Sequence, residues 1–318
     1  MRFIIKIGER SIKKKICMRQ LIENFIKRIE KENNLVEAVC YSNSKGIVFS
    51  KHYIPRLTRN IFSHSKSFTS TMVGIAIDEG KVSLDTRLVD VFKDEIDEAT
   101  YNRLFDITVL SLLTMSSGFD GAFLMTNERS KGIGYPDYFN YLIEKDLKYK
   151  PGSKFCYSNG DTYLLGRIIQ KVYNRDFRDL CYEKIFVPLD IGYTSWAVDP
   201  KGYCLAATGL ELNVEDMNKL GILYLNNGIY NGKRIVSEKW VEMCKREWIV
   251  DPNTSWGNYS LQWWMVPEGN GFRADGMFGQ ITIVWPKYDT VLSFQRPDDE
   301  RMPELKKILD EEILSKIR

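Results

Sequence analysis

Ser63 and Lys66 are a pair of residues whose chemical types and spacing could support catalysis. A serine hydroxyl is a poor nucleophile until a neighbouring base takes its proton. We predict a helix from about Ser65 to Glu79, and residues three apart on a helix share one face. At the N-terminus of this helix, free N–H groups favour developing negative charge and, together with burial, lower the pKa of Lys66. The spacing alone is equally typical of an N-cap serine followed by an exposed lysine.

Tyr157 and Asn159 form a second candidate group, on a loop before another predicted helix. The phenol could shuttle a proton, and the amide could bind a substrate carbonyl. A phenol with its usual pKa near ~10 is a poor base at neutral pH. A neighbouring ammonium such as Lys66 would lower that pKa and make Tyr157 a competent base. The alternative is a structural turn, because the segment 151–160 is rich in Asn, Gly and Ser.

Histidine is too scarce in this chain for the commonest hydrolytic sites, since only His52 and His64 occur. A Ser-His-Asp triad needs a histidine that reaches the nucleophile. His64 adjoins Ser63, so we expect its side chain to point to another face of the same turn, and His52 lies in a predicted strand. Six scattered cysteines without a Cys-x-x-Cys pair do not supply a zinc site, and we expect buried, reduced thiols. We therefore expect no metal, no cofactor and a base other than histidine.

The composition is that of an ordinary globular protein, with 44% hydrophobic and 27% charged residues. A net charge of +3 is too small to indicate binding to nucleic acid or to an anionic membrane. No apolar run approaches the length of a membrane span, and Lys6 interrupts the first apolar stretch too early for a signal peptide. We expect a cytoplasmic protein that acts on a small molecule or a short peptide. Its oligomeric state does not follow from the sequence.

Periodicity predicts strands near the two ends of the chain and helices between them. A helix over 18–33 precedes β-type runs at 36–41 and 47–52, which a hairpin signal joins. The strand-like runs of the last quarter and a closing helix lie at 261–266, 281–285, 291–295 and 302–317. The predicted helices of the middle lie near 108–115, 136–146, 161–173, 176–184, 214–226 and 237–246.

This order predicts an α/β (α+β) fold with an antiparallel sheet flanked by helices and an inserted all-helical domain. Residues 1–80 and 246–318 would build the sheet domain from both chain ends, and residues 81–245 would form the mainly helical insertion. We expect the active site in the cleft between the two domains.

Several stretches, taken together and in order, resemble the serine β-lactamase and penicillin-binding protein superfamily. The likeness is greatest to its class C branch and to the related esterases and 6-aminohexanoate-dimer hydrolases. The similar stretches are Ser63–Ser70, Asp78–Asp85, Ile107–Gly118, Tyr157–Asn159, Tyr224–Gly228 and Asn231–Val236. Each of these motifs is weak, but their common order over roughly residues 45–295 is specific.

The resemblance implies a β-lactamase/transpeptidase-like fold and gives each candidate residue a role. Ser63 would be the acylated nucleophile, Lys66 and Tyr157 the general-base and general-acid pair, and Asn159 a ligand for the substrate amide. The N–H groups of Ser63 and Met277 would form an oxyanion hole.

The third motif of the superfamily is altered in this chain. A strand there usually carries Lys-Thr-Gly, or His in place of Lys, and the matching residues here are Ala274, Asp275 and Gly276. The missing lysine would engage the carboxylate of a β-lactam. Arg273 could supply a cation, but we expect strand alternation to point it to the opposite face from Ala274, and Asp275 also to face away from the site. By the same alternation, Trp263 and Trp264 point to opposite faces, so at most one faces the cleft.

The sequence thus predicts a serine hydrolase that acylates Ser63 and cleaves an amide, an ester or a β-lactam. The altered third motif favours amides, peptides and esters over β-lactams. The alternative is a penicillin- or peptide-binding acyl sensor with little turnover.

Overall fold

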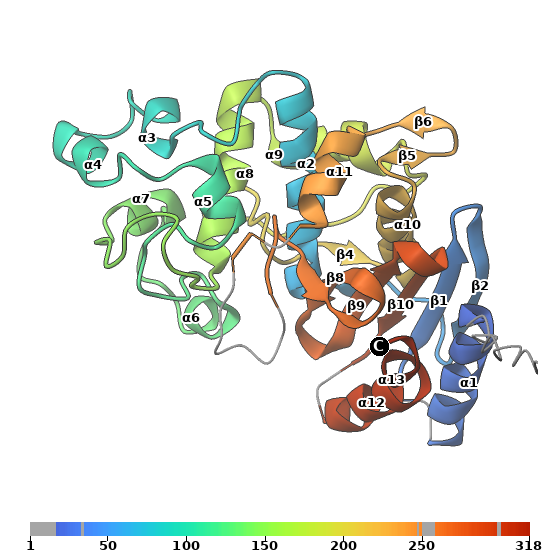
Figure 1. Cartoon of the computed structure of the whole chain (residues 1–318). Coiled ribbons are helices and arrows are strands. Elements are labelled where there is room, and N and C mark those ends of the chain that lie inside the picture. Colours follow the sequence, from blue (N-terminus) through green and yellow to red (C-terminus); the bar gives the residue numbers. More distant parts are fainter. Residues whose placement is uncertain (1–16, 33–34, 247, 250–257, 298–299) are drawn as a thin grey trace, which may run out of the picture.

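A six-stranded antiparallel sheet lies at the centre of the computed structural model, which describes residues 17–32, 35–246, 248–249, 258–297 and 300–318 (Figure 1). The strand order is β2-β1-β10-β9-β8-β7, so the first strands pair with the last ones. In the pair β1–β10, for example, Val39 lies opposite Phe294. The strands are β1 (Ala38–Asn43), β2 (Gly46–His52), β7 (Trp264–Val266), β8 (Gly271–Gly276), β9 (Gln280–Trp285) and β10 (Thr290–Gln295). This confirms the predicted antiparallel sheet.

Helices from the two chain ends cover one face of the sheet (Figure 1). They are α1 (Met18–Lys31), α12 (Met302–Leu309) and α13 (Ser315–Ile317), the last two joined by the π-helical turn Asp310–Leu314. Apolar side chains such as Phe25 and Ile308 pack there against Ile283 and Phe294. Since helices also cover the other face, every residue of β9 and β10 is buried.

The other face of the sheet packs against α10 (Val214–Leu225) and α2 (Ser65–Asp78). The approach of α10 is close, because a Cβ atom on Gly221 would lie 2.4 Å from Cγ1 of Val291. Helix α10 falls in the part of the chain for which we predict a separate helical domain, yet it contacts β1, β9 and β10. The domain boundaries therefore remain a prediction.

Helix α2 is buried along nearly its whole length, and its polar side chains bond to surrounding loops. Ser67 Oγ donates to the carbonyl of Gln262 at 2.9 Å, and Thr69 Oγ1 donates to that of Ala206 at 2.8 Å. Hydrogen bonds of this kind satisfy the polar groups that burial would otherwise leave without partners. They also fix the helix that carries Lys66.

Helix α8 (Asn159–Tyr173) is the central helix of the remaining part and packs against α2. In the same part of the chain lie α3 (Leu88–Val91), α4 (Glu98–Arg103), α5 (Val109–Leu113), α6 (Thr126–Ser130), α7 (Tyr138–Ile143) and α9 (Phe177–Cys181), whereas α11 (Glu238–Cys244) packs against α2. The chain also forms two short antiparallel strand pairs. They are β3 (Arg59–Asn60) with β4 (Glu211–Leu212) and β5 (Ile229–Tyr230) with β6 (Lys233–Arg234). All the predicted helices of the middle are present. Most have shorter bounds than predicted, but α8 begins two residues earlier.

The six cysteines are all free thiols, and four of them are buried, while Cys17 is exposed and Cys156 is half-buried. Within the described ranges, no helix combines the length and apolar character that crossing a bilayer requires. No group of three or more His, Cys, Asp or Glu side chains is placed to hold a metal ion there either.

Candidate active site

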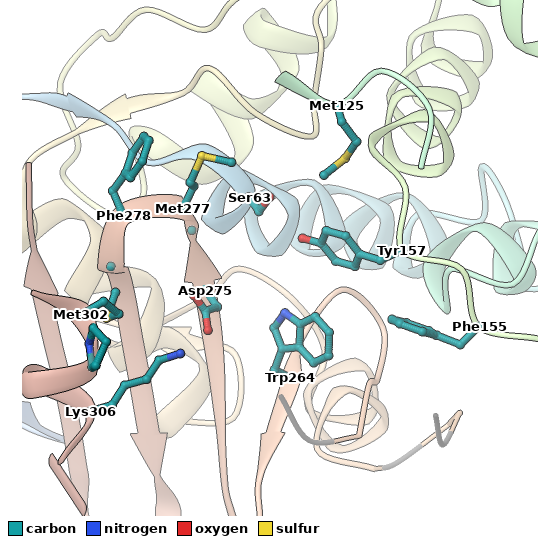
Figure 2. Close-up of a pocket in the computed structure, with 13 residues that line it drawn as sticks. Ser63, Met125, Phe155, Tyr157, Trp264, Asp275, Met277, Phe278, Met302 and Lys306 are labelled. Atoms are coloured by element: carbon teal, nitrogen blue, oxygen red, sulfur yellow. The ribbon is translucent and has the colours of Figure 1, made fainter. Parts of the chain in front are cut away.

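Ser63 lies in a 3₁₀ turn (Phe62–His64) that leads directly into α2. The turn begins at Phe62, whose φ of 48° is uncommon for a residue other than glycine. The side chain of Asn60 supports this conformation, since its Oδ1 accepts the N–H of Phe62 at 2.8 Å and that of Gly209 at 3.2 Å. The Ser63 side chain is half-buried and lines a cavity (Figure 2).

Lys66 is buried, with 1% of its surface exposed, and all its hydrogen-bonding partners are neutral. Its Nζ lies 3.0 Å from Ser63 Oγ, 2.5 Å from Asn159 Oδ1 and 3.1 Å from the carbonyl oxygen of Ala207. Burial lowers the pKa of Lys66 well below its usual value, and the charge of Arg129 lowers it further. A neutral amine donates two hydrogens, which suit the two carbonyl oxygens, and its lone pair then faces the Ser63 hydroxyl.

Tyr157 contributes a phenol beside this amine. Its ring centroid lies 4.9 Å from Lys66 Nζ and 5.6 Å from the centroid of the stacked Trp264 ring. Burial raises the pKa of Tyr157 above its usual value, and a hydrogen bond with Ser63 offsets only part of that rise. The expectation that an ammonium at Lys66 lowers the pKa of Tyr157 is therefore wrong. Burial acts on both groups, because it raises the pKa of Tyr157 and lowers the pKa of Lys66.

Asn159 is the first residue of α8, and the Ser158 hydroxyl caps this helix by accepting the N–H of Gly160 at 3.0 Å. The Asn159 amide is buried and points back to Lys66. Ser63, Lys66, Tyr157 and Asn159, here called the Ser63 group, are thus brought together from α2 and from the start of α8, although about ninety residues separate the two pairs.

Strand β8 presents Asp275, and not Ala274, to the cavity, which corrects the expectation for both residues (Figure 2). Ala274 is 1% exposed and belongs to the core between the sheet and the helices. Asp275 accepts a hydrogen bond from Nε of Arg273 at 2.9 Å. The reason is the strand pairing, because Trp264 of β7 lies opposite Arg273 and residues two apart on a strand share one face. Trp264 lines the cavity while Trp263 is buried in the core, as strand alternation predicts.

Gly276 and Met277 bring the end of β8 against the turn that carries Ser63. A Cβ atom on Gly276 would lie 2.1 Å from the carbonyl oxygen of Ile61, so only glycine allows this approach. Phe278 has a φ of 64°, and its ring packs edge-on against that of Phe62 with the centroids 5.0 Å apart. Two residues in the left-handed region thus flank Ser63 and Met277. Backbone strain of this kind is typical of functional sites.

The cavity has a volume of about 700 Å³ and is open to solvent on one side. Most of its side chains are apolar and come from five separate segments. Among them the sequence singled out Met277, and it allowed at most one of Trp263 and Trp264 to face the cleft. These side chains, here called the apolar wall, are Met125, Phe155, Trp264, Met277, Phe278, Met302 and Pro303. Polar groups on the rim include the Asp275 carboxylate and the Lys306 amine (Figure 2).

Neither histidine is placed to act on Ser63. His64 is fully buried, its Nε2 bonds to Thr282 Oγ1 of β9 at 2.9 Å, and burial lowers its pKa to about 3. His52 lies away from the cavity, and its Nε2 is 2.6 Å from Oε1 of Glu215 on α10. The Lys66 amine, by contrast, lies within hydrogen-bonding distance of the Ser63 hydroxyl.

Comparison with known proteins gives matches by family, by sequence and by structure. The family model described as Beta-lactamase matches residues 57–295. The sequence is 26% identical over 257 residues to 6-aminohexanoate-dimer hydrolase from Paenarthrobacter ureafaciens, which covers 73% of this chain and 64% of the hydrolase. This chain thus spans less than two thirds of the length of that relative.

Two solved structures show the same fold at low sequence identity. The first is a Bacillus anthracis protein provisionally assigned as a 6-aminohexanoate-dimer hydrolase, with a TM-score of 0.75, 20% identity and coverage of 92% of this chain and 81% of that one. The second is a family VIII carboxylesterase, with a TM-score of 0.71, 16% identity and coverage of 92% and 97%.

Proposed function

Because the chain belongs to the β-lactamase family, we propose that it is a serine hydrolase, of the class C-like kind, that forms an acyl-enzyme at Ser63. The observation that carries the proposal is the position of Lys66, a buried amine of lowered pKa whose Nζ lies 3.0 Å from Ser63 Oγ at the edge of an apolar cavity. A neutral amine within hydrogen-bonding distance of a hydroxyl is an arrangement that activates a nucleophile.

Acylation begins when the neutral Lys66 amine takes the Ser63 proton as Oγ attacks the substrate carbonyl carbon. The electron pair of the carbonyl bond moves to its oxygen, which the N–H groups of Ser63 and Met277 stabilise. When the tetrahedral intermediate collapses, the bond to the leaving group breaks and Tyr157 donates its proton to the departing oxygen or nitrogen. The products are a Ser63 ester, a Lys66 ammonium and a Tyr157 phenolate.

Deacylation restores both side chains. The Tyr157 phenolate takes a proton from a water molecule, and the resulting hydroxide attacks the ester carbon. Ser63 Oγ then leaves and receives its proton from the Lys66 ammonium. The raised pKa of Tyr157 makes its phenolate a strong base for this step, and the lowered pKa of Lys66 makes its ammonium a good acid.

The shape and charge of the cavity favour uncharged esters or amides with a bulky apolar group. The apolar wall supplies the contact surface for such a group. At the position of the missing lysine, Ala274 lies in the core. On the cavity side Arg273 and Asp275 pair with each other, so this ion pair does not offer a substrate carboxylate the cation that the lysine would supply. β-Lactams and peptides that end in a carboxylate near the scissile bond are accordingly disfavoured.

Intact-protein mass spectrometry with a fluorescent penicillin and with a p-nitrophenyl ester of a medium-chain fatty acid tests this function. We expect a transient ester adduct that Ser63→Ala abolishes, together with release of p-nitrophenol. A stable adduct without turnover would indicate that the protein is an acyl sensor and not a hydrolase. If neither reagent labels the wild-type chain, the proposed acylation of Ser63 is wrong.

A further inference from the structure

Leu124, directly before the short helix α6, is held in an unusual conformation by two side chains of that helix. It is buried, with 1% exposure, and has a φ of 59°. Glu128 Oε2 accepts the N–H of Leu124, and Arg129 Nε donates to the carbonyl oxygen of Leu124 at 3.0 Å. A branched side chain in the left-handed region persists only where neighbours fix the backbone. These two contacts show what fixes it here.

The carbonyl oxygen of Leu124 also accepts a hydrogen bond from Asn159 Nδ2 at 3.0 Å. This bond determines which way the Asn159 amide faces, because an amide that presents its NH₂ to Leu124 presents its oxygen on the other side. That oxygen, Oδ1, lies 2.5 Å from Lys66 Nζ. A continuous path of hydrogen bonds therefore runs from Arg129 through Leu124 and Asn159 to Lys66.

The positive charge of the Arg129 guanidinium can act on Lys66. Its guanidinium is half-buried, and it makes no ion pair with any carboxylate in the described part of the chain. The adjacent Glu128 is already bonded to Leu124 and to the hydroxyl of Tyr141. After burial, the charge of Arg129 is the second cause of the lowered pKa of Lys66.

We propose that Arg129 is a positioning residue that holds the Leu124 carbonyl, and through it the Asn159 amide, in the orientation that Lys66 and Ser63 require. The inference rests on the proposed function, since it assigns Arg129 to the same reaction. Arg129 itself does not line the cavity. Its effect reaches the reacting atoms through Asn159 and through its charge, which opposes protonation of Lys66.

Other titratable groups surround Lys66 and must be separated from this effect. Tyr157 faces it from the loop before α8, and burial keeps the phenol protonated. His64, on the same turn as Ser63, has a pKa of about 3 and stays neutral above that pH. Asp161 of α8 is the group that titrates near neutrality, because burial raises its pKa to about 7. The pH profiles must therefore also be measured with Asp161→Asn.

The test compares Arg129→Gln and Arg129→Lys with the matched control Arg103→Gln. Arg103 also bonds backbone carbonyls, at Ile143 and Lys145, and it does not line the cavity. For Arg129→Gln we expect kcat on an uncharged ester to fall by about ten- to a hundredfold with little change in KM. The acid limb of the pH profile of kcat moves to higher pH in this variant, because Lys66 is protonated more easily once the charge of Arg129 is removed. Arg129→Lys keeps the charge, so its limb stays in place and its kcat falls less.

An acid limb that does not move in Arg129→Gln, in either the native or the Asp161→Asn background, overturns the proposal. An effect of Arg129→Gln that matches Arg103→Gln in melting temperature and activity also overturns it. If Arg129→Gln does not fold, Arg129→Lys decides the question, since a wild-type kcat in that variant refutes the positioning role.

A readout without turnover separates this inference from the proposed function. The ¹³Cε chemical shift of Lys66, assigned by its loss in Lys66→Arg, reports protonation of the amine directly. If the wild-type chain hydrolyses no ester, the proposed function fails, but a Lys66 titration that shifts to higher pH in Arg129→Gln still supports the action of Arg129. An identical titration in both proteins contradicts it.

Discussion

The Ser63 group and the apolar wall adjoin each other in the cavity but are built in opposite ways. In the Ser63 group, Lys66 alone bonds to three partners and is buried. The apolar wall collects side chains from separate segments, including Met125 near α6 and Met302 on α12, and faces an open cavity. The difference indicates that the chemistry depends on exact placement of a few polar atoms, whereas substrate choice depends on the shape of a surface.

The comparison predicts that the largest losses follow substitution of Lys66. In Lys66→Met the amine that faces Ser63 Oγ disappears, and kcat should fall by about a thousandfold or more, as expected for residues that act as one unit. Lys66→Arg should be as inactive, because a guanidinium stays protonated and cannot take the Ser63 proton. Steady-state hydrolysis of a p-nitrophenyl ester measures both.

Arg19→Met, on the exposed face of α1, is a suitable control because, among the described residues, Arg19 bonds to Glu23 on the protein surface and not to any residue of the cavity. Lys66→Met with activity near that of the control would show that another group acts as the base.

Removal of the Tyr157 hydroxyl should have the next largest effect. Tyr157→Phe keeps the stacked contact with Trp264 and deletes only the proton donor. We expect kcat to fall by about a hundredfold, within the usual range for a general acid or base. The loss in kcat/KM, which reports acylation and not the deacylation step that also uses Tyr157, should be smaller for p-nitrophenyl esters than for alkyl esters or amides, because p-nitrophenolate leaves without a proton. Equal losses for both substrate types would contradict the assignment of Tyr157 as the proton donor to the leaving group.

Substitutions on the β8 side should change selectivity more than rate. Asp275→Thr removes the carboxylate on the cavity side, and kcat/KM for a substrate with a carboxylate near the scissile bond should rise by about tenfold relative to its uncharged analogue. Ala274→Lys places a charge in the core and should lower the melting temperature without creating β-lactamase activity. Parallel assays with nitrocefin and with a neutral ester measure the ratio of kcat/KM for the charged substrate to that for the uncharged one. A gain in nitrocefin hydrolysis by Ala274→Lys would show that residue 274 reaches the substrate.

The same contrast explains which parts of the molecule the sequence could predict. The sheet follows from alternation, which is local, whereas the choice of Ser63, Lys66 and Asn159 follows from their places in an ordered set of motifs. The lowered pKa of Lys66 was predicted, but the raised pKa of Tyr157 was not, because it depends on burial by distant segments. The prediction that Asp275 faces away from the site was wrong, because the face that Asp275 occupies depends on the pairing of Arg273 with Trp264.

The apolar wall also could not be predicted from the sequence. Met125 and Phe155 come from separate loops, and Met302 and Pro303 come from a helix outside the residues that the family model matches. No periodicity or motif connects these segments before the chain has folded.

The smallest predicted effect concerns stability, and it distinguishes a buried carboxyl group of α8 from the open wall. Asp161 accepts a hydrogen bond from Ser117 at 2.8 Å, and its Oδ2 has no partner. Burial raises the pKa of Asp161 from 3.8 to about 7, so the folded chain binds this proton more tightly than the unfolded chain. The contribution is therefore fully present below the unfolded pKa and is lost as the pH rises through about 7.

Between pH 6 and pH 8 this group alone should lower the free energy of unfolding by about 1 kcal/mol in the wild-type chain. Urea unfolding at the two pH values measures the change. Asp161→Asn should abolish this pH dependence, and Asp275→Asn, on the cavity side, should leave it in place. A wild-type chain that keeps the same stability at both pH values, or an Asp275→Asn variant that loses the dependence, would show that the Asp161 carboxyl is not the group that titrates.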